Sequence, residues 1–438
     1  MTAALSVAYS GLTAEQARLY RLLGLFPGPS LDIGIAVCVA GAAPETTEDL
    51  LDALEDAALL EWDEEAGRYR LPEAARPHAR ECALHEESEQ EREAVLERCV
   101  DYYVTGAAFA DLAVLGAARL RVGGEAAHRP GAFDPFDAPG RDRAARRRAA
   151  LAWLAAERRD ALAVLRAAAE HGGMARQVWQ LAESLTALYL HHRHVDDWRV
   201  CCDLGIEAAV TEGEPEAEAR LRALLSRPLL DAGEEGRARA ELDSALALAG
   251  LADDRQLRAG VHVADGHYWL AREPRRAIAA YERALALNEQ AGQDRATAVV
   301  DYYLGQALSV AGELGQARTL LEDAHQRLRE LEDDRTAGRA LAALGRVYDA
   351  QGEQDAAQEA YENAVRMLRE NQAAHYEARA LEDWAGLDQR AGRAQEARER
   401  LLRALEIHET VGGPRAESVR RRLAEQPPAP PAHSPSRT

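Results

Sequence analysis

The chain has 438 residues and a formal net charge of −21, from 74 acidic and 53 basic side chains. A field of this sign repels phosphate backbones, which argues against general nucleic-acid binding. Every basic side chain apart from histidine is arginine, so the sequence cannot supply a Walker A lysine or a lysine that forms a Schiff base. Alanine, leucine, glutamate and arginine dominate, and these residues favour helix.

The first part of the chain has the element order of a winged helix. Three helical patterns come first, and a short hairpin and a further helix follow. The predicted elements are helices over 13–25, 32–40 and 46–60, strands over 60–63 and 68–71, and a helix over 73–84. We therefore predict a winged-helix domain over residues 1–87.

A helical linker is predicted over residues 88–175, interrupted at 122–142 by a loop rich in glycine and proline. The tail, residues 425–438, lacks apolar side chains able to form a core and is expected to be disordered. Residues 1–11 lack the features of a secretory signal, and no stretch approaches the roughly 20 apolar residues that span a bilayer. The five cysteines lack the spacing of a disulfide framework, so we expect reduced thiols in a cytoplasmic protein.

The second half of the chain carries an internal repeat with a period of forty residues. Two alanine positions keep this spacing through four copies, and a glycine position keeps it through three. The repeated residues are Ala277, Ala317, Ala357 and Ala397, then Ala284, Ala324, Ala364 and Ala404, then Gly312, Gly352 and Gly392. Apolar residues recur between them at the helical period. An ordinary helical bundle would not maintain such a register.

Each repeat is predicted to form a hairpin of two helices. The glycine ends the first helix in a left-handed conformation, and the two alanines let the second helix approach closely. Leu-Gly pairs at 304–305 and 344–345 precede this pattern, and Asp265 takes the place of the glycine in an earlier copy. The pattern resembles the tetratricopeptide repeat. We predict an all-α fold in which about six such hairpins form a superhelical solenoid over residues 176–424.

Several segments together resemble one protein family. The most specific is Ala152–Arg158, of sequence AWLAAER. The others are Leu12–Gly24, Phe26–Pro29, Leu50–Leu60, Gly67–Leu71 and Asp196–Trp198. In this order they resemble the C-terminal half of the actinobacterial signal-transduction ATPases with numerous domains (STAND). These are NB-ARC regulators that end in tetratricopeptide repeats, and they include antibiotic-pathway regulators of the SARP type. The resemblance implies a winged helix followed by a repeat sensor.

Two departures from that family concern its nucleotide site. The sequence contains no GxxxxGK[ST] segment, so the nucleotide-binding module of the family is not found in it. The family also places a His-Asp pair after the wing, where the histidine reaches the nucleotide phosphate. Pro72 and Glu73 occupy the matching positions here. We therefore expect no nucleotide binding and no cofactor.

Two clusters offer side chains of the kind that bind metals. His78, Cys82 and His85 share one helical face, but no fourth ligand stands nearby, and a half-buried helix face explains them as well. The sequence HHRH at 191–194 precedes a Cys-Cys pair at 201–202, where a polar turn and small core thiols are the alternative. The sequence shows no nucleophile elbow, glycine-rich phosphate loop or paired-carboxylate motif. We therefore predict neither a metal site nor an enzyme.

The winged helix raises the hypothesis of a transcriptional regulator that binds DNA. Its candidate recognition helix, however, carries five acids and no arginine, and phosphates repel each carboxylate in the major groove. The five acids are Glu48, Asp49, Asp52, Glu55 and Asp56. The one basic run, residues 141–148, is explained by a solvated helix start. DNA binding and the sensor part of a longer STAND ATPase remain the alternative functions.

The concave face of the solenoid is the predicted binding surface. Projecting inward positions through the forty-residue register selects mainly arginines, with only three acids, Asp231, Asp349 and Glu382. The predicted partner-binding residues are Arg220, Arg227, His262, Trp269, Tyr302, Gln306, Arg339, Arg346, Arg379 and Arg390. Arginine forks bind carboxylates in a bidentate way, so we predict a regulatory or scaffold protein that binds an acidic or C-terminal peptide segment. The alternative is that these arginines pair internally, for instance Arg346 with Asp349.

Overall fold

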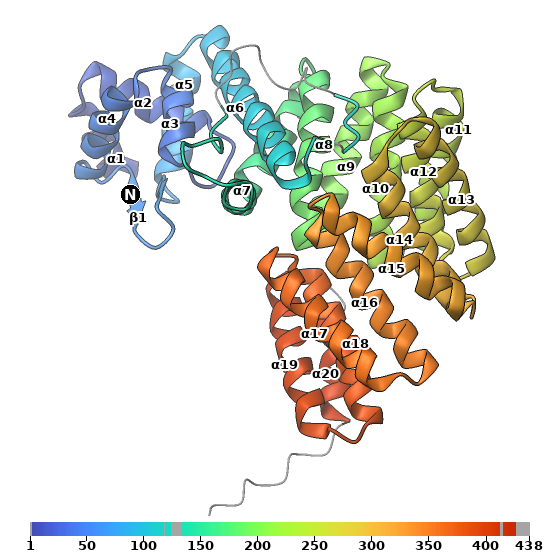
Figure 1. Cartoon of the computed structure of the whole chain (residues 1–438). Coiled ribbons are helices and arrows are strands. Elements are labelled where there is room, and N and C mark those ends of the chain that lie inside the picture. The colour runs from blue at the N-terminus through green and yellow to red at the C-terminus, as the bar shows by residue number, and fades with distance from the viewer. Residues whose placement is uncertain (1, 118, 124–133, 412–414, 426–438) are drawn as a thin grey trace, which may run out of the picture. The chain divides into compact units, whose positions relative to one another are not determined.

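The computed structural model describes residues 2–117, 119–123, 134–411 and 415–425 (Figure 1). These residues form helices α1 to α20 and one two-stranded sheet, so the predicted all-α fold is confirmed. Residues 124–133 of the predicted loop and 426–438 of the predicted tail lie outside the described residues.

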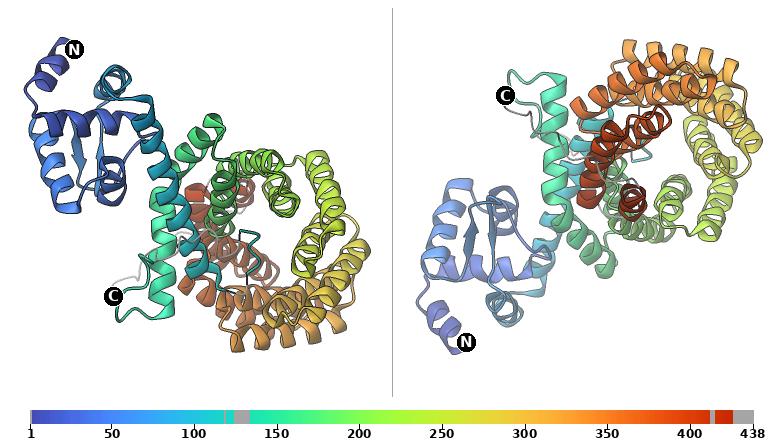
Figure 2. Two further views of the ribbon diagram at one scale, coloured as in Figure 1. Left: turned by 90° about the horizontal axis from the view of Figure 1, so that it is seen from above. Right: turned by 90° about the horizontal axis from the view of Figure 1, so that it is seen from below.

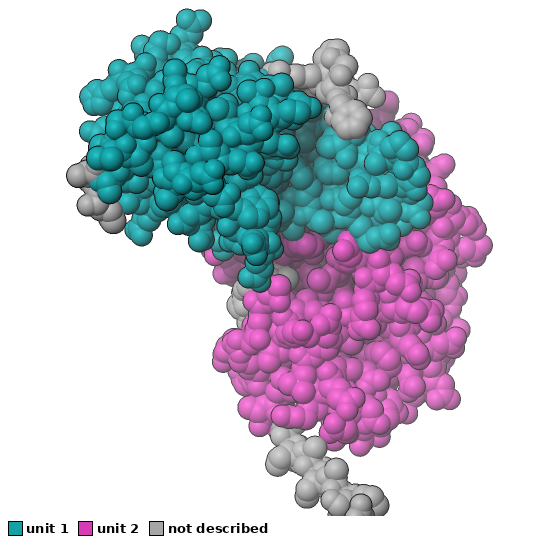
Figure 3. All heavy atoms as spheres, turned by 90° about the vertical axis from the view of Figure 1, so that its left-hand side faces the viewer, with its two compact units in different colours: residues 1–116, 123–187, 203–214 teal, residues 117–122, 188–202, 215–438 magenta. Residues whose placement is uncertain are grey.

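Contacts within the chain divide it into two compact units, coloured separately in Figure 3. Unit 1 comprises residues 1–116, 123–187 and 203–214, and unit 2 comprises residues 117–122, 188–202 and 215–438. The domain boundaries predicted at residues 87, 175 and 424 fall at the ends of helices and stay predictions as domain limits.

Unit 1 begins with a helix, α1 (Thr2–Ser10), that has no counterpart among the predictions. The elements that follow it come in the predicted order. The others are α2 (Ala14–Leu25), α3 (Ile33–Ala40), α4 (Pro44–Asp56), β1 (Glu61–Asp63), β2 (Arg68–Arg70) and α5 (Ala75–Glu86). The start of α2 is fixed by a capping box, in which the side chains of Thr13 and Gln16 each accept a hydrogen bond from the other's backbone N–H.

Helix α4 ends before the predicted residue 60. Ala58 adopts a positive φ of 55°, which breaks the helix, and the chain then turns to bury Leu59 and Leu60. Strands β1 and β2 pair antiparallel with Trp62 opposite Tyr69, and Leu31 forms a single bridge to Tyr69. This arrangement is compatible with a winged helix, whose assignment stays a prediction.

The predicted helical linker consists of two long helices that pack against each other, α6 (Glu89–Leu115) and α7 (Arg143–His171). The side chains of Ser88 and Asp142 cap their N-termini. A Cβ on Gly106 would lie 2.7 Å from the ring of Trp153, so only glycine lets α6 approach this tryptophan. The most family-like segment of the sequence is therefore a helix–helix packing site.

The remaining helices are α8 to α20, of which α10 to α19 form five successive antiparallel pairs and α20 packs against α19 (Figure 1). Their bounds are α8 (Ala175–His192), α9 (Val195–Glu212), α10 (Pro215–Asp231), α11 (Glu235–Leu251), α12 (Arg255–Trp269), α13 (Pro274–Gln290), α14 (Asp294–Val310), α15 (Leu314–Glu330), α16 (Asp334–Gln351), α17 (Gln354–Glu370), α18 (Ala374–Arg390), α19 (Ala394–Val411) and α20 (Arg415–Ala424). Figure 2 shows that the pairs within unit 2 follow a curved path, as expected of a solenoid.

The repeated small residues do what their spacing predicts. All eight repeated alanines are fully buried. Gly312, Gly352 and Gly392 have φ values of 85°, 80° and 76°, so each ends its helix in the left-handed conformation. Small size also matters inside the first helix of each pair. A Cβ on Gly345 would lie 2.8 Å from the ring of Tyr361 in the second helix.

One register assignment is wrong. Asp265 does not occupy the glycine position of its repeat, because Gly266 does: a Cβ there would lie 2.4 Å from Tyr281. The equivalent glycine of α14 is Gly305, which faces Leu321 of α15. Gly266 of α12 therefore precedes Gly305 by thirty-nine residues rather than forty. The α12–α13 turn, Leu270–Glu273, also lacks the glycine that the later turns contain.

Candidate functional site

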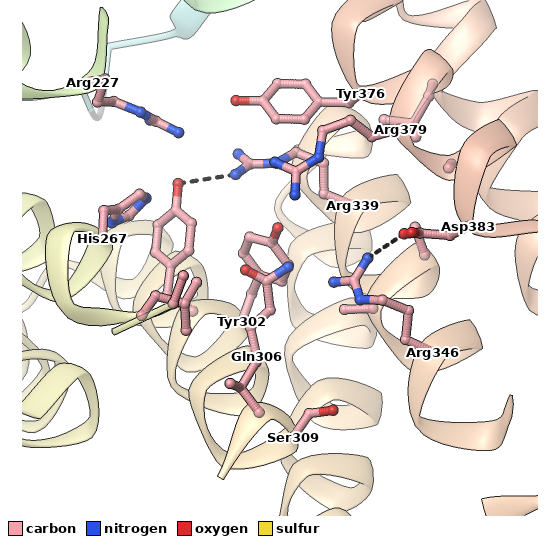
Figure 4. Close-up of a pocket in the computed structure, with 18 residues that line it drawn as sticks. Arg227, His267, Tyr302, Gln306, Ser309, Arg339, Arg346, Tyr376, Arg379 and Asp383 are labelled. Atoms are coloured by element: carbon pink, nitrogen blue, oxygen red, sulfur yellow. Dashed lines mark hydrogen bonds and ion pairs between the residues drawn. The ribbon is translucent and has the colours of Figure 1, made fainter. Parts of the chain in front are cut away.

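A pocket of about 470 Å³ lies on the inner side of unit 2 (Figure 4). Its lining comes mainly from the first helix of five consecutive pairs, α10, α12, α14, α16 and α18, with two residues of the α12–α13 turn and one leucine from α17. Residues that are more than 150 positions apart in the sequence, such as Arg227 and Asp383, therefore meet around one space. This convergence requires the curvature of the solenoid, because neighbouring helices alone would present a flat row.

Six of the ten predicted binding residues line this pocket: Arg227, Tyr302, Gln306, Arg339, Arg346 and Arg379. Arg220 instead lines a second cavity of about 220 Å³, which shares Arg227, His267 and Tyr303 with the first. His262, Trp269 and Arg390 line neither cavity. The role of all ten in partner binding remains a prediction.

The forty-residue spacing selects His262 and Trp269 as pocket residues because it is one residue too long at α12. A shift of one residue turns a helical side chain by about 100°. With the spacing of thirty-nine residues, the positions equivalent to Tyr302, Gln306 and Ser309 are Val263, His267 and Leu270. Each of these three lines one or both cavities. Trp269 instead lies under the guanidinium of Arg276, 4.4 Å from the ring centroid, and donates to Asp265.

Arg339 occupies the floor of the pocket and is 6% exposed. Its guanidinium lies 4.9 Å from the ring centroid of Tyr302 and 4.1 Å from that of Tyr376, and it donates to the hydroxyl of Tyr303 at 3.2 Å. The Nε of Arg339 and the hydroxyl of Tyr376 are buried and have no hydrogen-bond partner in the described part of the chain. A buried charge held by aromatic faces rather than by a carboxylate is the central feature of the site.

The one acid in the lining is Asp383, which accepts a hydrogen bond from Arg346 at 2.8 Å. The alternative of internal pairing therefore holds for Arg346 and Arg390, but the named pair is wrong: Arg346 pairs with Asp383, and Asp349 pairs with Arg390. The other two projected acids are also engaged outside the pocket. Asp231 pairs with Arg193 at 3.1 Å, and Glu382 contacts His408 at 2.9 Å.

Four important lining residues were not predicted: His267, Tyr303, Tyr376 and Asp383. With the corrected spacing of thirty-nine residues, Gln306 projects onto His267. Tyr303 and Asp383 each come directly after a projected residue, Tyr302 and Glu382. Tyr376 lies near the start of α18, and no repeat position signals it. Burial and the charge of Arg227 hold the pKa of His267 well below its ordinary value, so this ring is neutral.

Electrostatics around the tyrosines reflects the excess of arginine. Burial alone would raise the pKa of Tyr376, but the charges of Arg339, Arg227 and other arginines lower it well below its ordinary value. The pKa of Tyr303 is lowered in the same way, against the effect of burial, chiefly by Arg339 and Arg227. The pocket is thus strongly positive inside a protein whose net charge is −21.

The metal-type cluster on α5 has another explanation. The Nδ1 of His78 lies 3.0 Å from the hydroxyl of Tyr20, and the thiol of Cys82 lies 3.9 Å from the same ring. Within the described residues, no group of three or more His, Cys, Asp or Glu side chains gathers as metal ligands would.

None of the helices described is long and apolar enough to cross a membrane.

The wing arginine Arg68 is not available to a nucleic acid. It is 11% exposed and pairs with Glu157 and Asp160 of α7. By contrast, all five acids of the candidate recognition helix α4 are exposed. This surface is acidic where DNA binding requires positive charge.

Comparison with known proteins shows that residues 294–370 match the tetratricopeptide repeat family. The chain is also homologous to AfsR-type regulators. It is 34% identical over 258 residues to the regulatory protein AfsR of Streptomyces griseus, and 34% identical over 264 residues to that of Streptomyces coelicolor. Each alignment covers 58% of this chain but only 25% of the relative, so the chain spans about a quarter of the length of these proteins.

Two solved structures resemble the chain at low identity. One is a STAND protein with a tetratricopeptide repeat sensor from Pyrococcus horikoshii, with a TM-score of 0.44, 14% identity and coverage of 95% of this chain and 63% of that one. The other is a Rap protein complexed with competence and sporulation factor, with a TM-score of 0.48, 11% identity and coverage of 98% and 100%.

Proposed function

We propose that this chain is a non-enzymatic regulatory protein whose solenoid binds an acidic segment of another protein in the arginine-lined pocket. Homology to AfsR-type regulators supports the regulatory role, and the tetratricopeptide repeat match supports protein binding as its mode of action. The aligned region covers only 25% of these relatives, so the activities of the whole relatives are not transferred to this chain.

One observation carries the proposal. Four arginines line the pocket with a single aspartate, and in the described structure Arg227, Arg339 and Arg379 have no carboxylate partner. Guanidinium groups in a partly desolvated cleft favour an anionic ligand, and their forks match carboxylates. Gln306 and Ser309 on the α14 side of the pocket add neutral polar groups suited to a peptide backbone.

Site-directed photo-crosslinking tests the proposal. Ser309 lines the pocket and is replaced by the photoreactive residue p-benzoylphenylalanine, and Gln358, exposed on the outer helix α17, is replaced as the control. We expect the Ser309 variant, in cells of the native host, to crosslink a protein through an acidic segment identified by mass spectrometry. The reaction should fail when Arg379→Glu is added, whereas Arg366→Glu, an exposed charge reversal on α17, should leave it unchanged. Crosslinks that persist in the Arg379→Glu background would contradict the proposal.

The alternative of DNA binding through the winged helix is opposed by the exposed acids of α4 and by the burial of Arg68. A mobility-shift assay against the upstream region of its own gene decides between the two. Under the proposal no specific shift occurs at physiological salt.

A further inference from the structure

The charges around the pocket do not balance. Asp383 is engaged by Arg346, which leaves the guanidinium groups of Arg227, Arg339 and Arg379 without a carboxylate among the described residues. Arg339 is buried at the floor, Arg227 is half-buried, and Arg379 is exposed at the mouth. In Figure 4 the side chains of Arg339 and Arg379 point into the same space, with Arg227 at the opposite end.

A ligand with a single negative charge would leave most of this charge uncompensated. A carboxylate offers one charge and two oxygens, whereas a phosphomonoester carries a charge of about −1.5 to −2 and three acceptor oxygens. Guanidinium forks on two sides of one pocket match the second group better, because a phosphate has three oxygens to share among them. The open Nε of Arg339 adds a buried donor at the floor.

We propose that the pocket is a phosphate site, and that its natural occupant is a phosphorylated serine or threonine of the partner segment. This inference rests on the proposed function, and it names the chemical group that the pocket selects. The pKa values of Tyr303 and Tyr376 are lowered, against the effect of burial, by the neighbouring arginines, which is the direction expected beside guanidinium groups that face no carboxylate.

The aromatic residues argue against a nucleotide as the ligand. A nucleotide would need an open ring face on which its base can stack. The guanidinium of Arg339 already lies over Tyr302 and Tyr376, and Tyr303 stacks on Tyr281 at a centroid distance of 5.7 Å. His267 packs edge-on against Tyr303 at 4.3 Å. The rings thus serve to hold the arginine and one another.

The size of the pocket argues for a phosphorylated peptide rather than phosphate alone. About 470 Å³ is far more than a phosphate group fills, since a water molecule occupies only about 30 Å³ of liquid. The excess space is bordered by Leu270, Val310 and Gln306, which are apolar or neutral. These residues suit the backbone and side chains that flank a phosphorylated residue.

Fluorescence anisotropy with three peptide libraries tests the proposal on the full chain. The libraries share degenerate flanks and carry phosphoserine, glutamate or serine at the centre. We expect phosphoserine to bind at least tenfold more tightly than glutamate, and serine not at all. At fixed ionic strength, inorganic phosphate should displace the phosphoserine library and acetate should not.

Variants at two arginines that are not fully buried separate a loss of binding from a loss of folding. Arg227→Gln and Arg379→Gln remove single guanidinium groups that have no internal ion pair in the described structure, and each should weaken phosphoserine binding at least fivefold. Arg366→Gln on α17 is the matched control and should change nothing. Circular dichroism and the melting temperature confirm that all three variants fold.

Each other outcome overturns the inference in a recognisable way. Equal affinity for glutamate and phosphoserine would show that the pocket selects carboxylates, and the proposed function would stand. Phosphate binding that depends on Arg379 without any peptide binding would assign the site to a small phosphorylated molecule instead. Absence of all binding would reject the phosphate site, while the crosslinking experiment would still decide the proposed function by itself.

Discussion

Arg68 in unit 1, whose side chain is 11% exposed, and Arg339 in unit 2, which is 6% exposed, have very different neighbours. Arg68 donates to Ser30 at 2.8 Å and pairs with both Glu157 and Asp160. The same two carboxylates accept further hydrogen bonds from Tyr103, at 2.8 Å, and from the backbone N–H of Ser30, at 2.9 Å. Arg339 faces three tyrosine rings and no carboxylate.

This difference indicates that Arg68 stabilises the fold, whereas Arg339 is available to bind an anionic ligand. A buried pair with its hydrogen bonds filled is costly to break from one side, because the remaining ion is left uncompensated. A buried cation without an acid already bears that cost in the folded chain, so removing it takes away little stability. Whether a buried arginine stabilises the fold or is available to a ligand therefore depends on whether a carboxylate of the chain lies beside it.

The largest expected effect is the loss of Arg68. Arg68→Met leaves the buried carboxylates of Glu157 and Asp160 without their ion-pair partner, and we expect unit 1 to lose about 3–5 kcal/mol of stability. Hydrogen exchange measured by mass spectrometry reads this locally, from peptides of α7 and β2. Arg70→Met is the matched control, because Arg70 is 56% exposed and its pair with Glu61 is worth at most about 1 kcal/mol. Equal exchange in the two variants would show that the Arg68 network is not structural.

The second effect is a dependence on pH that has opposite signs in the two units. Burial raises the pKa values of Glu157 and Asp160, although Arg68 and their hydrogen bonds oppose it. Their folded forms bind protons more readily than the unfolded chain does, so unit 1 should gain stability as pH falls from neutral towards these raised values. In unit 2, burial would raise the pKa of Asp333, but Arg295 and Arg335 lower it to about 2.

Asp333 therefore contributes stability that is present above its ordinary pKa and is lost as pH falls towards 2, on the order of 2 kcal/mol in total. Exchange rates corrected for intrinsic pH dependence should show α7 becoming more protected as pH falls from neutral. The start of α16 should become less protected only below about pH 4. Asp333→Asn should abolish the second change. The same sign in both units would contradict the assignment of the two clusters.

Arg339→Met should have a smaller effect on stability than either of these. It removes an uncompensated charge, but also a hydrogen bond to Tyr303 and contacts with three rings, each worth about 0.5–1 kcal/mol. Since these contributions oppose each other, we expect the stability of unit 2 to change by no more than about 1 kcal/mol. Binding of the phosphoserine library should nevertheless be lost. A loss of 3 kcal/mol or more in urea unfolding would make Arg339 a structural residue like Arg68.

The solenoid could be predicted from the sequence because its contacts are local and repeated. A buried alanine and a left-handed glycine at a fixed spacing identify a helix pair without any knowledge of distant residues. The same reasoning failed at α12, where a turn without glycine changes the spacing by one residue and turns Trp269 away from the pocket.

The charge balance of the site could not be predicted in the same way. Asp383 belongs to the same space as Arg346 only because of how α18 packs on α16. Likewise, nothing in the sequence pairs Arg68 with Glu157, which lies 89 residues further on. Which arginines have partners depends on long-range packing, and that is the property on which the function of each depends.

The smallest expected effect comes from the single acid of the pocket. Asp383→Asn releases Arg346 from its 2.8 Å pair and adds one unit of positive charge to the lining. Because the Asp383 side chain is 34% exposed and its pair lies at the surface of the cavity, little stability should be lost. Anion affinity should instead rise, by about three- to tenfold at low salt and less at high salt, since one more charge near a phosphate is worth about 1 kcal/mol there. Asp323→Asn on the outer face of α15 makes the same change in net charge and should leave anisotropy titrations with the phosphoserine library unaltered. Weaker binding in the Asp383 variant would mean that this acid orients Arg346 for the ligand. The pocket would then contain a matched pair of the kind found in unit 1, and the contrast between the two units would rest on Arg227, Arg339 and Arg379 alone.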